Sequence, residues 1–222
     1  MQPFEKRWLM FDHARMRSFV RSEWRCILDL MKKCHYNGLG LYMEGAFEDP
    51  DRPGVPRPGS VSQADVDFLK EECAARGIFL FPLTNGMFHM EHFLCQERYA
   101  DLRDTGAYER NQIHYEDPRA TEMAMHIIHA VAKLFGTTYI HIGCDEAILP
   151  RTRIDGCGQY IANICKTMLK EGLTPAVWSD MFWMEPQLAA LLPRETEIFD
   201  WNYYGHRPES IQFFQRLGFR HV

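Results

Sequence analysis

The sequence predicts an α/β fold of the (β/α)8 barrel type, and three observations carry that prediction. Short apolar segments alternate with amphipathic helical segments along the whole chain, which requires parallel strands joined by helical crossovers. No G-x-G-x-x-G or P-loop pattern occurs, so the competing open, doubly wound nucleotide-binding sheet has no support. A barrel gathers the carboxyl ends of its strands around one pocket, and polar residues end one predicted strand after another: Asp12, Glu44, Asn85, Asp145, Asp180 and Asn202.

Length and composition fit one packed domain over residues 1–222. The chain is 46% hydrophobic and 25% charged, which is ordinary for a globular protein. A formal net charge of −5, without a block of Lys and Arg, argues against nucleic acid as a partner. No apolar run is long enough to span a membrane, and the N-terminus lacks a secretory signal pattern. Seven cysteines without a C-x-x-C pair predict a reduced, cytoplasmic protein.

The elements follow one another in strict alternation. Strands are predicted at residues 8–11, 39–43, 78–83, 139–143, 175–178, 197–201 and 219–222, and helices at 18–34, 62–76, 91–102, 118–135, 159–171, 186–192 and 208–217. Ser62 is expected to cap the second helix, and Gly136 and Gly172 are expected to end later ones. The loop at residues 45–59 carries four prolines, and a loop of that length in a compact domain is either functional or mobile.

The number of predicted strands does not close a barrel. Seven strands are predicted, whereas a closed barrel of this type has one more and typically runs to about 250 residues. Two open edges would leave unpaired backbone N–H and C=O groups beside the core. The chain is therefore expected to lack the last strand–helix unit, or to have the gap closed by a neighbouring chain, with a homodimer as one form.

The segment that ends at Asp145 and Glu146 is the strongest candidate for chemistry. Strand alternation places His141, Gly143 and Asp145 on one face, pointing into the barrel. Asp145 and Glu146 can face one pocket only if the strand ends near Cys144 and the chain bends. Adjacent carboxylates in a partly buried pocket drive their pKa values apart, so one can serve as a general acid while the other stays ionised. The alternative is that the two acids cap the following segment.

Further polar and aromatic residues are predicted to face the same pocket. Alternation puts Glu44 at the inward end of the second strand and places Asn202 and Tyr204 on one face of the sixth. Asn202 offers an amide and Tyr204 a hydroxyl to a polar ligand. Trp178, at the end of the fifth strand, offers an apolar face to a sugar ring, although core packing is the alternative for any single aromatic residue.

A metal site is the weaker interpretation of the histidines. His89 and His92 form an H-x-x-H pattern that could join His141 and Asp145 around a metal ion. The pattern is neither H-E-x-x-H nor a dense Cys/His cluster, so no metal is expected.

At these residues the chain resembles glycoside hydrolase family 20, the β-N-acetylhexosaminidases, and is most similar to the short intracellular branch that includes hexosaminidase D. The most specific motif of the resemblance is the H-x-G-x-D-E block that ends at Glu146. The segments that carry the resemblance, in the family's order, are Arg7 to Arg15 (R-x-x-x-x-D-x-x-R), Asn37 to Glu44, His89 to Glu91, Tyr139 to Ala147, Trp178 to Phe182 and Trp201 to Tyr204.

The resemblance implies an exo-acting, retaining glycosidase without a protein nucleophile or a cofactor. The substrate's own 2-acetamido oxygen would attack the anomeric carbon and form an oxazolinium intermediate, which makes the family an exception to the usual pairing of two carboxylates across the bond. Asp145 would orient the acetamide and stabilise its nitrogen, while Glu146 would protonate the leaving oxygen and then activate water. The implied partner is an oligosaccharide or glycoconjugate with a terminal GlcNAc or GalNAc.

The resemblance also implies the residues that hold the sugar. Arg7 would bind sugar hydroxyls, Trp178 would pack on the acetamide and Tyr204 would donate to its oxygen. His89, with Glu44, would tune the acid. The expected substrate-binding residues are Arg7, Glu44, His89, His141, Trp178, Asn202 and Tyr204.

Two departures from the family keep other functions open. Asn202 stands where the family has Asp, and the last strand, which brings a Trp and an acidic residue to the sugar, would lie beyond Val222. These departures favour a non-catalytic, sugar-binding barrel as the first alternative. A metal-dependent barrel hydrolase that uses His89, His141 and Asp145 is the second.

Overall fold

The computed structural model describes residues 4–15, 19–49, 51, 59–104, 110–148, 150–205 and 207–222. Ser18, the predicted start of the first helix, and positions 50 and 52–58 of the proline-containing loop lie outside the described residues. Six parallel strands form a single sheet in the described part of the chain: β1 (Trp8–Asp12), β2 (Gly38–Tyr42), β3 (Phe79–Leu83), β4 (Tyr139–His141), β5 (Thr174–Trp178) and β6 (Glu197–Phe199).

The strands lie in the sheet in the order in which they occur in the chain, β1-β2-β3-β4-β5-β6, and every pair is parallel. A doubly wound sheet reverses its strand order at a switch point, so the sequential order is that of a barrel wall. The predicted α/β barrel class is therefore confirmed.

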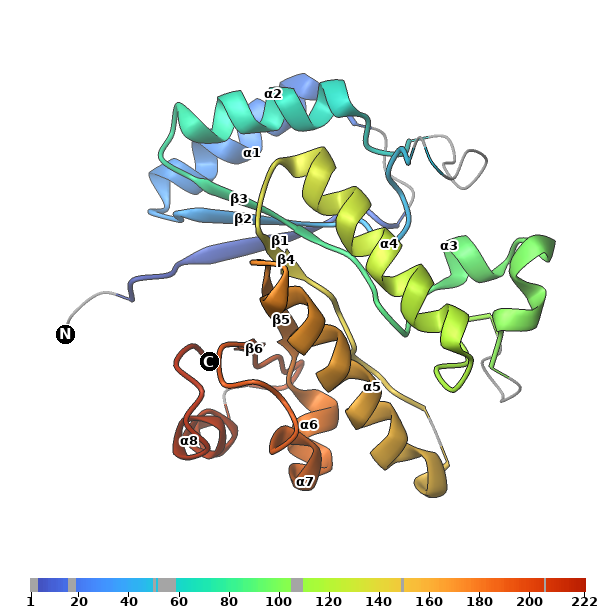
Figure 1. Ribbon diagram of the computed structural model, residues 1–222. Coiled ribbons are helices and arrows are strands. Elements are labelled where there is room, and N and C mark those ends of the chain that lie inside the picture. Colours follow the sequence, from blue (N-terminus) through green and yellow to red (C-terminus); the bar gives the residue numbers. More distant parts are fainter. Residues whose placement is uncertain are drawn as a thin grey trace.

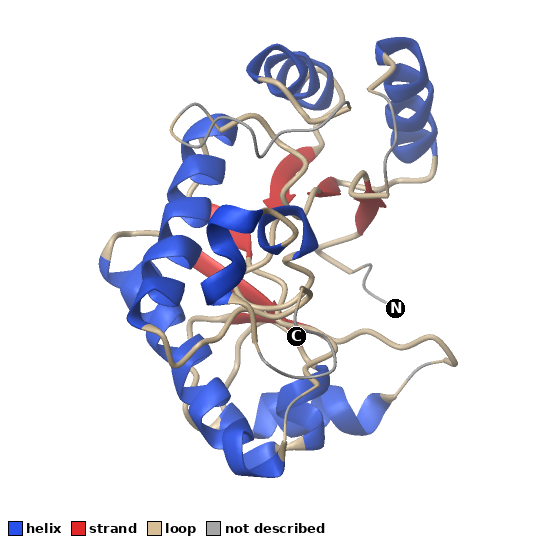
Figure 2. Ribbon diagram, turned by 90° about the vertical axis from the view of Figure 1, so that its right-hand side faces the viewer, coloured by secondary structure: helices blue, strands red, loops and turns tan. Residues whose placement is uncertain are grey.

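Helices cover the outer face of the curved sheet. In Figure 1 they follow the strands around it, from α1 and α2 at the top through α4 and α5 to α6, α7 and α8 at the bottom. Figure 2 shows helices above, to the left of and below the strands. The helices are α1 (Arg21–Lys33), α2 (Gln63–Ala74), α3 (Glu91–Leu94), the 3-10 helix η1 (Glu97–Leu102), α4 (Pro118–Phe135), α5 (Arg151–Lys170), α6 (Asp180–Met184), α7 (Pro186–Ala189) and α8 (Pro208–Arg216). None of these described helices is both long and apolar enough to cross a bilayer.

Local signals set the boundaries of the best-predicted helices. The Ser62 side chain accepts a hydrogen bond from the backbone of Asp65, whose carboxylate accepts one from the Ser62 backbone in return, so both orphan donors at the start of α2 are satisfied. Asp117 caps α4, Pro118 occupies its first turn, and Gly136 ends it in the left-handed conformation at φ 59°. The predicted bounds of α4 are those observed.

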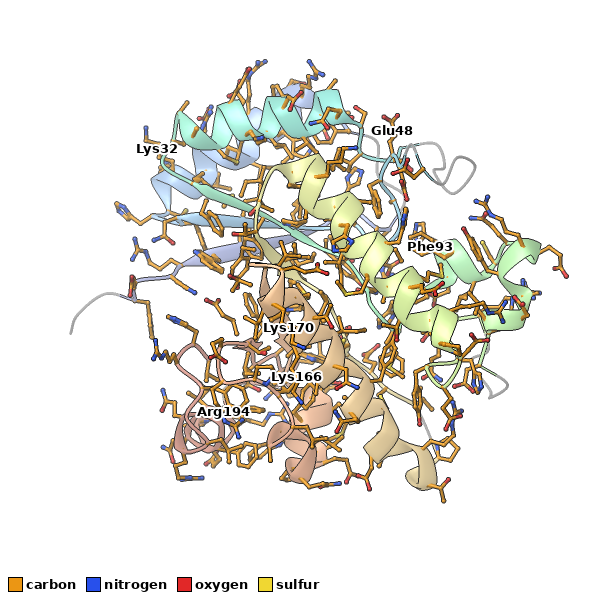
Figure 3. All side chains as sticks on the ribbon, in the orientation of Figure 1. Lys32, Glu48, Phe93, Lys166, Lys170 and Arg194 are labelled. Carbon is orange, nitrogen blue, oxygen red and sulfur yellow. The ribbon has the colours of Figure 1, made fainter. Side chains whose placement is uncertain are left out.

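The periodicity of α5 shows how helices pack on the sheet. Ile161, Cys165 and Met168 are fully buried on its inner face. Lys166 and Lys170, one turn apart, lie exposed on its outer face, where both are labelled in Figure 3. This amphipathic pattern fixes which side of the helix meets the barrel wall.

A second, smaller cluster of apolar side chains lies on the inner side of the sheet. Phe81 is 1% exposed and packs against Trp8 of β1 at 4.8 Å and against Tyr139 of β4 at 5.3 Å between ring centroids. The cluster consists of Trp8, Ala14, Tyr42, Phe81, Leu83, Tyr139, Ala176, Trp178 and Phe199. Alternation therefore holds: Ile140 and Ile142 pack with the helices outside, while His141 points inward against Trp178.

The two outer strands approach each other at the amino end of the barrel. Lys6 Nζ lies 2.7 Å from the Glu197 carboxylate of β6, which also accepts a hydrogen bond from the Tyr139 hydroxyl at 2.5 Å. The rings of Trp8 and Phe199 lie 6.1 Å apart. Side chains, rather than backbone hydrogen bonds, thus join β1 to β6 within the described residues.

The seventh predicted strand, at 219–222, is wrong. The described backbone at these positions forms no strand, and one hydrogen bond, from the Ile198 N–H to the His221 carbonyl at 3.1 Å, joins it to β6. Gly218, at φ 90°, turns the chain immediately before this segment. The apolar residue Phe219 instead packs on Phe214 of α8, which explains why the segment has strand-like composition without a strand partner.

Two helix predictions also differ from the structure. The segment predicted as one helix at 91–102 is α3 followed by η1, because Gln96 adopts an extended conformation at ψ 137° that interrupts the helix. The helix predicted at 159–171 begins eight residues earlier, at Arg151, directly after Pro150. The short helix α6, which starts at Asp180, has no counterpart among the predicted elements.

Candidate functional site

A cavity of about 310 Å³ lies at the carboxyl ends of the strands, where a barrel forms its active site. Its walls come from the ends of β1, β2 and β5 and from the loops that follow β1, β3, β4 and β6. The lining residues are Met10, Asp12, Arg15, Tyr42, His89, Asp145, Glu146, Trp178, Trp201, Asn202 and Tyr203. A larger cavity, of about 420 Å³, lies between β1 and β6 and holds the Lys6–Glu197 pair, away from the two adjacent acids.

The chain bends sharply after β4 and brings the two acids to this cavity. β4 ends at His141, and Gly143, Cys144 and Glu146 then adopt left-handed backbone conformations at φ 71°, 76° and 56°. Side-chain-bearing residues adopt this conformation at a cost of about 1–3 kcal/mol each, which marks a site where the surrounding structure imposes the backbone. Asp145 and Glu146 both line the cavity as a result.

His89 contacts both acids. Its Nε2 lies 3.5 Å from Asp145 Oδ2 and 3.4 Å from Glu146 Oε2. The hydrogen bond with Asp145 raises the pKa of His89 above its usual value, and the opposing effect of burial is smaller. On the other side of the ring, Nδ1 lies 3.5 Å from the Asn111 side-chain nitrogen. His89 Nε2 therefore lies within 3.5 Å of a carboxylate oxygen of each acid.

Asp180 fixes the backbone of the acid loop. Its Oδ2 accepts a hydrogen bond from the Glu146 N–H at 2.8 Å, and its Oδ1 accepts one from the Trp201 indole at 3.2 Å. Burial raises the pKa of Asp180. Sequence reasoning placed Asp180 at a strand end but gave it no role, because its two partners lie in other loops.

Glu44 lies behind the cavity wall and is 3% exposed. It accepts hydrogen bonds from Arg15 Nη1 at 2.9 Å and from the Tyr42 hydroxyl at 3.1 Å, and lies 3.0 Å from His92 Nδ1. Burial alone would raise the pKa of Glu44, but the hydrogen bond with His92 and the nearby charge of Arg15 hold it below its usual value. The ionised Glu44 thus positions Tyr42 and Arg15, two lining residues that were not among the predicted site residues.

Arg7 does not reach the cavity. It lies at the amino end of β1, where its guanidinium donates to the His35 carbonyl at 2.7 Å and to the Phe4 carbonyl. Arg7 is five positions from Asp12, so alternation turns it to the opposite face of the strand. The arginine at the cavity is Arg15, which also lies 3.4 Å from Asp12.

Tyr204 also lies outside the cavity, with 97% of its surface exposed. β6 ends at Phe199, and the Asn202 side chain accepts a hydrogen bond from the Tyr204 N–H at 3.0 Å, which folds the chain into a turn. Strand alternation does not extend through this turn. Asn202 and Tyr203 line the cavity instead, with the Tyr203 ring 4.9 Å from Trp201.

His141 lies inside the barrel rather than in the cavity wall. It is fully buried, its Nδ1 accepts a hydrogen bond from the Gly143 N–H at 3.1 Å, and its ring lies 4.5 Å from Trp178. Burial lowers the pKa of His141 to about 3, so the ring is neutral. His141 thus supports Trp178, which does line the cavity, from behind.

Comparison with known proteins defines the fold. No family model and no curated protein matches the sequence. Among solved structures, a β-N-acetylhexosaminidase from Bacteroides fragilis matches with a TM-score of 0.79 at 22% identity over 98% of this chain and 49% of that one. The fold is an α/β barrel. A β-N-acetylhexosaminidase of glycoside hydrolase family 20 from Streptomyces coelicolor matches with a TM-score of 0.73 at 17% identity, over 96% of this chain and 46% of the other.

A third similar barrel was solved with a sugar bound. It is a family 20 exo-β-N-acetylglucosaminidase from Vibrio harveyi in complex with N-acetylglucosamine, with a TM-score of 0.73 at 17% identity over 97% of this chain and 40% of that one. This chain spans about half the length of the first of these structures.

Proposed function

We propose that the chain belongs to glycoside hydrolase family 20, in the hexosaminidase D branch, and that its barrel is the catalytic part of a retaining, exo-acting β-N-acetylhexosaminidase. The observation that carries the proposal is the meeting of Asp145 and Glu146 at one cavity, with His89 in contact with both. The similarity of the fold to hexosaminidases supports it, as does the D-E sequence in the loop after β4.

The adjacent placement of two acids suits a reaction in which the protein supplies no nucleophile. The acetamido oxygen of the substrate attacks the anomeric carbon as the glycosidic bond breaks, and Glu146 gives its proton to the leaving oxygen. Asp145 orients the acetamide and stabilises the positive charge of the oxazolinium ion. Glu146 then takes a proton from the water that opens the ring and restores the acetamide. The configuration is retained because the anomeric carbon is attacked twice.

The remaining lining residues suit a sugar with an N-acetyl group. Trp178 and Trp201 provide aromatic faces for the acetamide methyl and the pyranose ring. Arg15 and Asn202 provide donors for hydroxyl groups, and Tyr203 takes the role that the family resemblance assigned to Tyr204. The substrate is accordingly an oligosaccharide or glycoconjugate with a terminal GlcNAc or GalNAc.

The proposal is tested by Glu146→Gln on two substrates that differ in leaving group. A general acid contributes about 10²–10⁴-fold, so cleavage of an N-acetylated disaccharide should fall by that factor. An aryl N-acetylglucosaminide with a good leaving group needs little protonation and should be affected less. Glu209→Gln, on the exposed face of α8, is the matched control and should retain full turnover of both substrates.

Other outcomes identify the alternatives. Equal loss on both substrates would remove Glu146 as the acid, and unchanged turnover by Asp145→Asn would remove Asp145 from the reaction. Sugar binding without turnover by the wild-type protein would favour the sugar-binding barrel. Loss of turnover in EDTA would favour a metal-dependent hydrolase.

A further inference from the structure

Three possible metal-ligand atoms of different residues converge in the cavity. His89 Nε2, an Asp145 carboxylate oxygen and a Glu146 carboxylate oxygen all lie within 4.8 Å of one another. One imidazole nitrogen and two carboxylate oxygens are ligands that Zn²⁺ accepts, and two carboxylates balance its charge.

The two distances from His89 fit a tetrahedral zinc ion. Zn–N and Zn–O bonds are about 2.0–2.1 Å long, so two ligand atoms on a tetrahedral zinc lie about 3.3–3.4 Å apart. His89 Nε2 is 3.5 Å from Asp145 Oδ2 and 3.4 Å from Glu146 Oε2. The Glu146 side chain is 48% exposed, which leaves it free to rotate and to shorten its separation from Asp145. Rotation of the Glu146 side chain, from a separation of at most 4.8 Å between the ligand atoms, would bring all three to one ion.

The surroundings leave one carboxylate oxygen of the cluster unsatisfied and leave room for a fourth ligand. The Asn111 side chain lies next to the far side of the His89 ring, and Asp145 Oδ1 is buried without a hydrogen-bond partner among the described residues. The cavity, lined on its other side by Trp201 and Asn202, gives a water molecule access to the fourth position of the ion. Three protein ligands and one open position form a common zinc arrangement.

We propose that His89, Asp145 and Glu146 form a zinc-binding site, and that zinc bound there inhibits the enzyme. The site itself stands on the geometry alone. The inhibition rests on the proposed function, because a zinc ion on both carboxylates would prevent Glu146 from donating a proton and Asp145 from binding the acetamide. Zinc and the N-acetyl sugar would then exclude each other from the cavity.

Binding is tested without reference to activity, by titrating zinc chloride into wild-type protein and variants at neutral pH in a calorimeter. His89→Gln removes one of three ligands and should weaken this binding step at least about tenfold, since loss of even an outer partner of a zinc ligand costs that much. His129→Gln is the matched control, because His129 forms an exposed pair with Glu171 at 2.6 Å on another face. His129→Gln should leave this zinc-binding step unchanged. Any zinc bound by the exposed cysteines would be bound equally by wild type and both variants.

Two results would overturn the zinc site. One is that wild type and His89→Gln bind zinc equally well or not at all. The other is that His129→Gln loses as much zinc affinity as His89→Gln. For the inhibition, we expect zinc to raise the KM of an aryl N-acetylglucosaminide and EDTA to restore it. Zinc that binds through His89 but leaves turnover unchanged, or increases it, would overturn the inhibition. Absence of hexosaminidase turnover in the wild-type protein would contradict the proposed function. The calorimetric experiment would still show whether the zinc site exists.

Discussion

At the scale of single residues, Asp180 shows how a half-buried carboxylate can fix the backbone of a residue whose side chain lines the cavity. Asp180 holds the backbone N–H of Glu146 and the indole of Trp201, so it joins the loops after β4 and β6 across the cavity. Both of these residues line the cavity. We infer that Asp180 is a positioning residue for the proposed reaction.

Asp180→Asn is expected to lower kcat for an N-acetylglucosaminide by about 10- to 100-fold, because one of the two donors loses its acceptor, and a hydrogen bond to a charged group contributes about 1.5–3 kcal/mol. KM should change less, since Trp178 and Arg15 remain. Steady-state kinetics provide the measurement. Asp155→Asn, at an exposed position on α5, should have wild-type kinetics; a change in KM alone for Asp180→Asn would contradict the positioning role.

The interaction of His89 with Asp145 is expected to make a pH-dependent contribution to the free energy of unfolding. The hydrogen bond with Asp145 raises the pKa of His89 in the folded protein. A raised pKa means that the contribution is fully present below the unfolded pKa of about 6.5 and is lost as the pH rises through the folded value. The free energy of unfolding of His89→Gln should therefore differ from wild type more in acid than in alkali. Urea unfolding across this pH range measures the difference, and a difference that grows with pH would contradict the assignment.

At the scale of elements, the bend after β4 depends on Gly143. At φ 71° a side chain is strained, and a Cβ there would lie 2.5 Å from Asn85 Oδ1 and 3.1 Å from the Thr84 carbonyl. Gly143→Ala should therefore displace the loop that carries Asp145 and Glu146, reduce stability by about 1–3 kcal/mol and abolish most turnover.

Gly172 provides the control for backbone strain. It has φ 78°, and no atom lies within 4 Å of the position that a Cβ would occupy, so Gly172→Ala carries the conformational cost, about 1–2 kcal/mol, without a clash. Chemical denaturation should show a loss of stability in both variants, whereas turnover should fall only in Gly143→Ala. Gly143→Ala with wild-type turnover would show that the bend does not depend on that glycine.

At the scale of the whole molecule, the inner aromatic cluster holds the curved sheet together. Phe81 of β3 contacts Trp8 of β1, Tyr139 of β4 and Phe199 of β6. The Phe81 side chain of β3 thus contacts residues of three other strands on the concave face. This packing brings the two outer strands near each other.

Phe81→Ala is expected to destabilise the protein by about 3–5 kcal/mol, the usual range for removing a fully buried phenylalanine. Phe79 is the same residue type on the same strand but is 41% exposed, so Phe79→Ala should cost less. Thermal or chemical unfolding of the two variants provides the comparison. Equal losses would indicate that the cluster does not depend on burial inside the barrel.

The sequence alone determined the features that follow from local pattern. Alternating apolar strands and helices predicted the class of fold, and the helix predicted at 118–135, with Gly136 at its end, has the bounds of α4. Strand alternation correctly turned His141 inward against Trp178, whereas Glu44, which follows the end of β2, lies behind the cavity wall instead of facing the pocket. The correct predictions succeed because side-chain direction has a fixed period within a regular element.

Only the tertiary structure decided which residues meet at the cavity. Strand alternation does not extend into loops, so it could not show that Tyr203 rather than Tyr204 faces the cavity. The bonds of Asp180 to Glu146 and of Glu44 to His92 join residues that are 34 and 48 positions apart. Such pairs depend on how the loops fold over the barrel mouth, and no local pattern in the sequence encodes that arrangement.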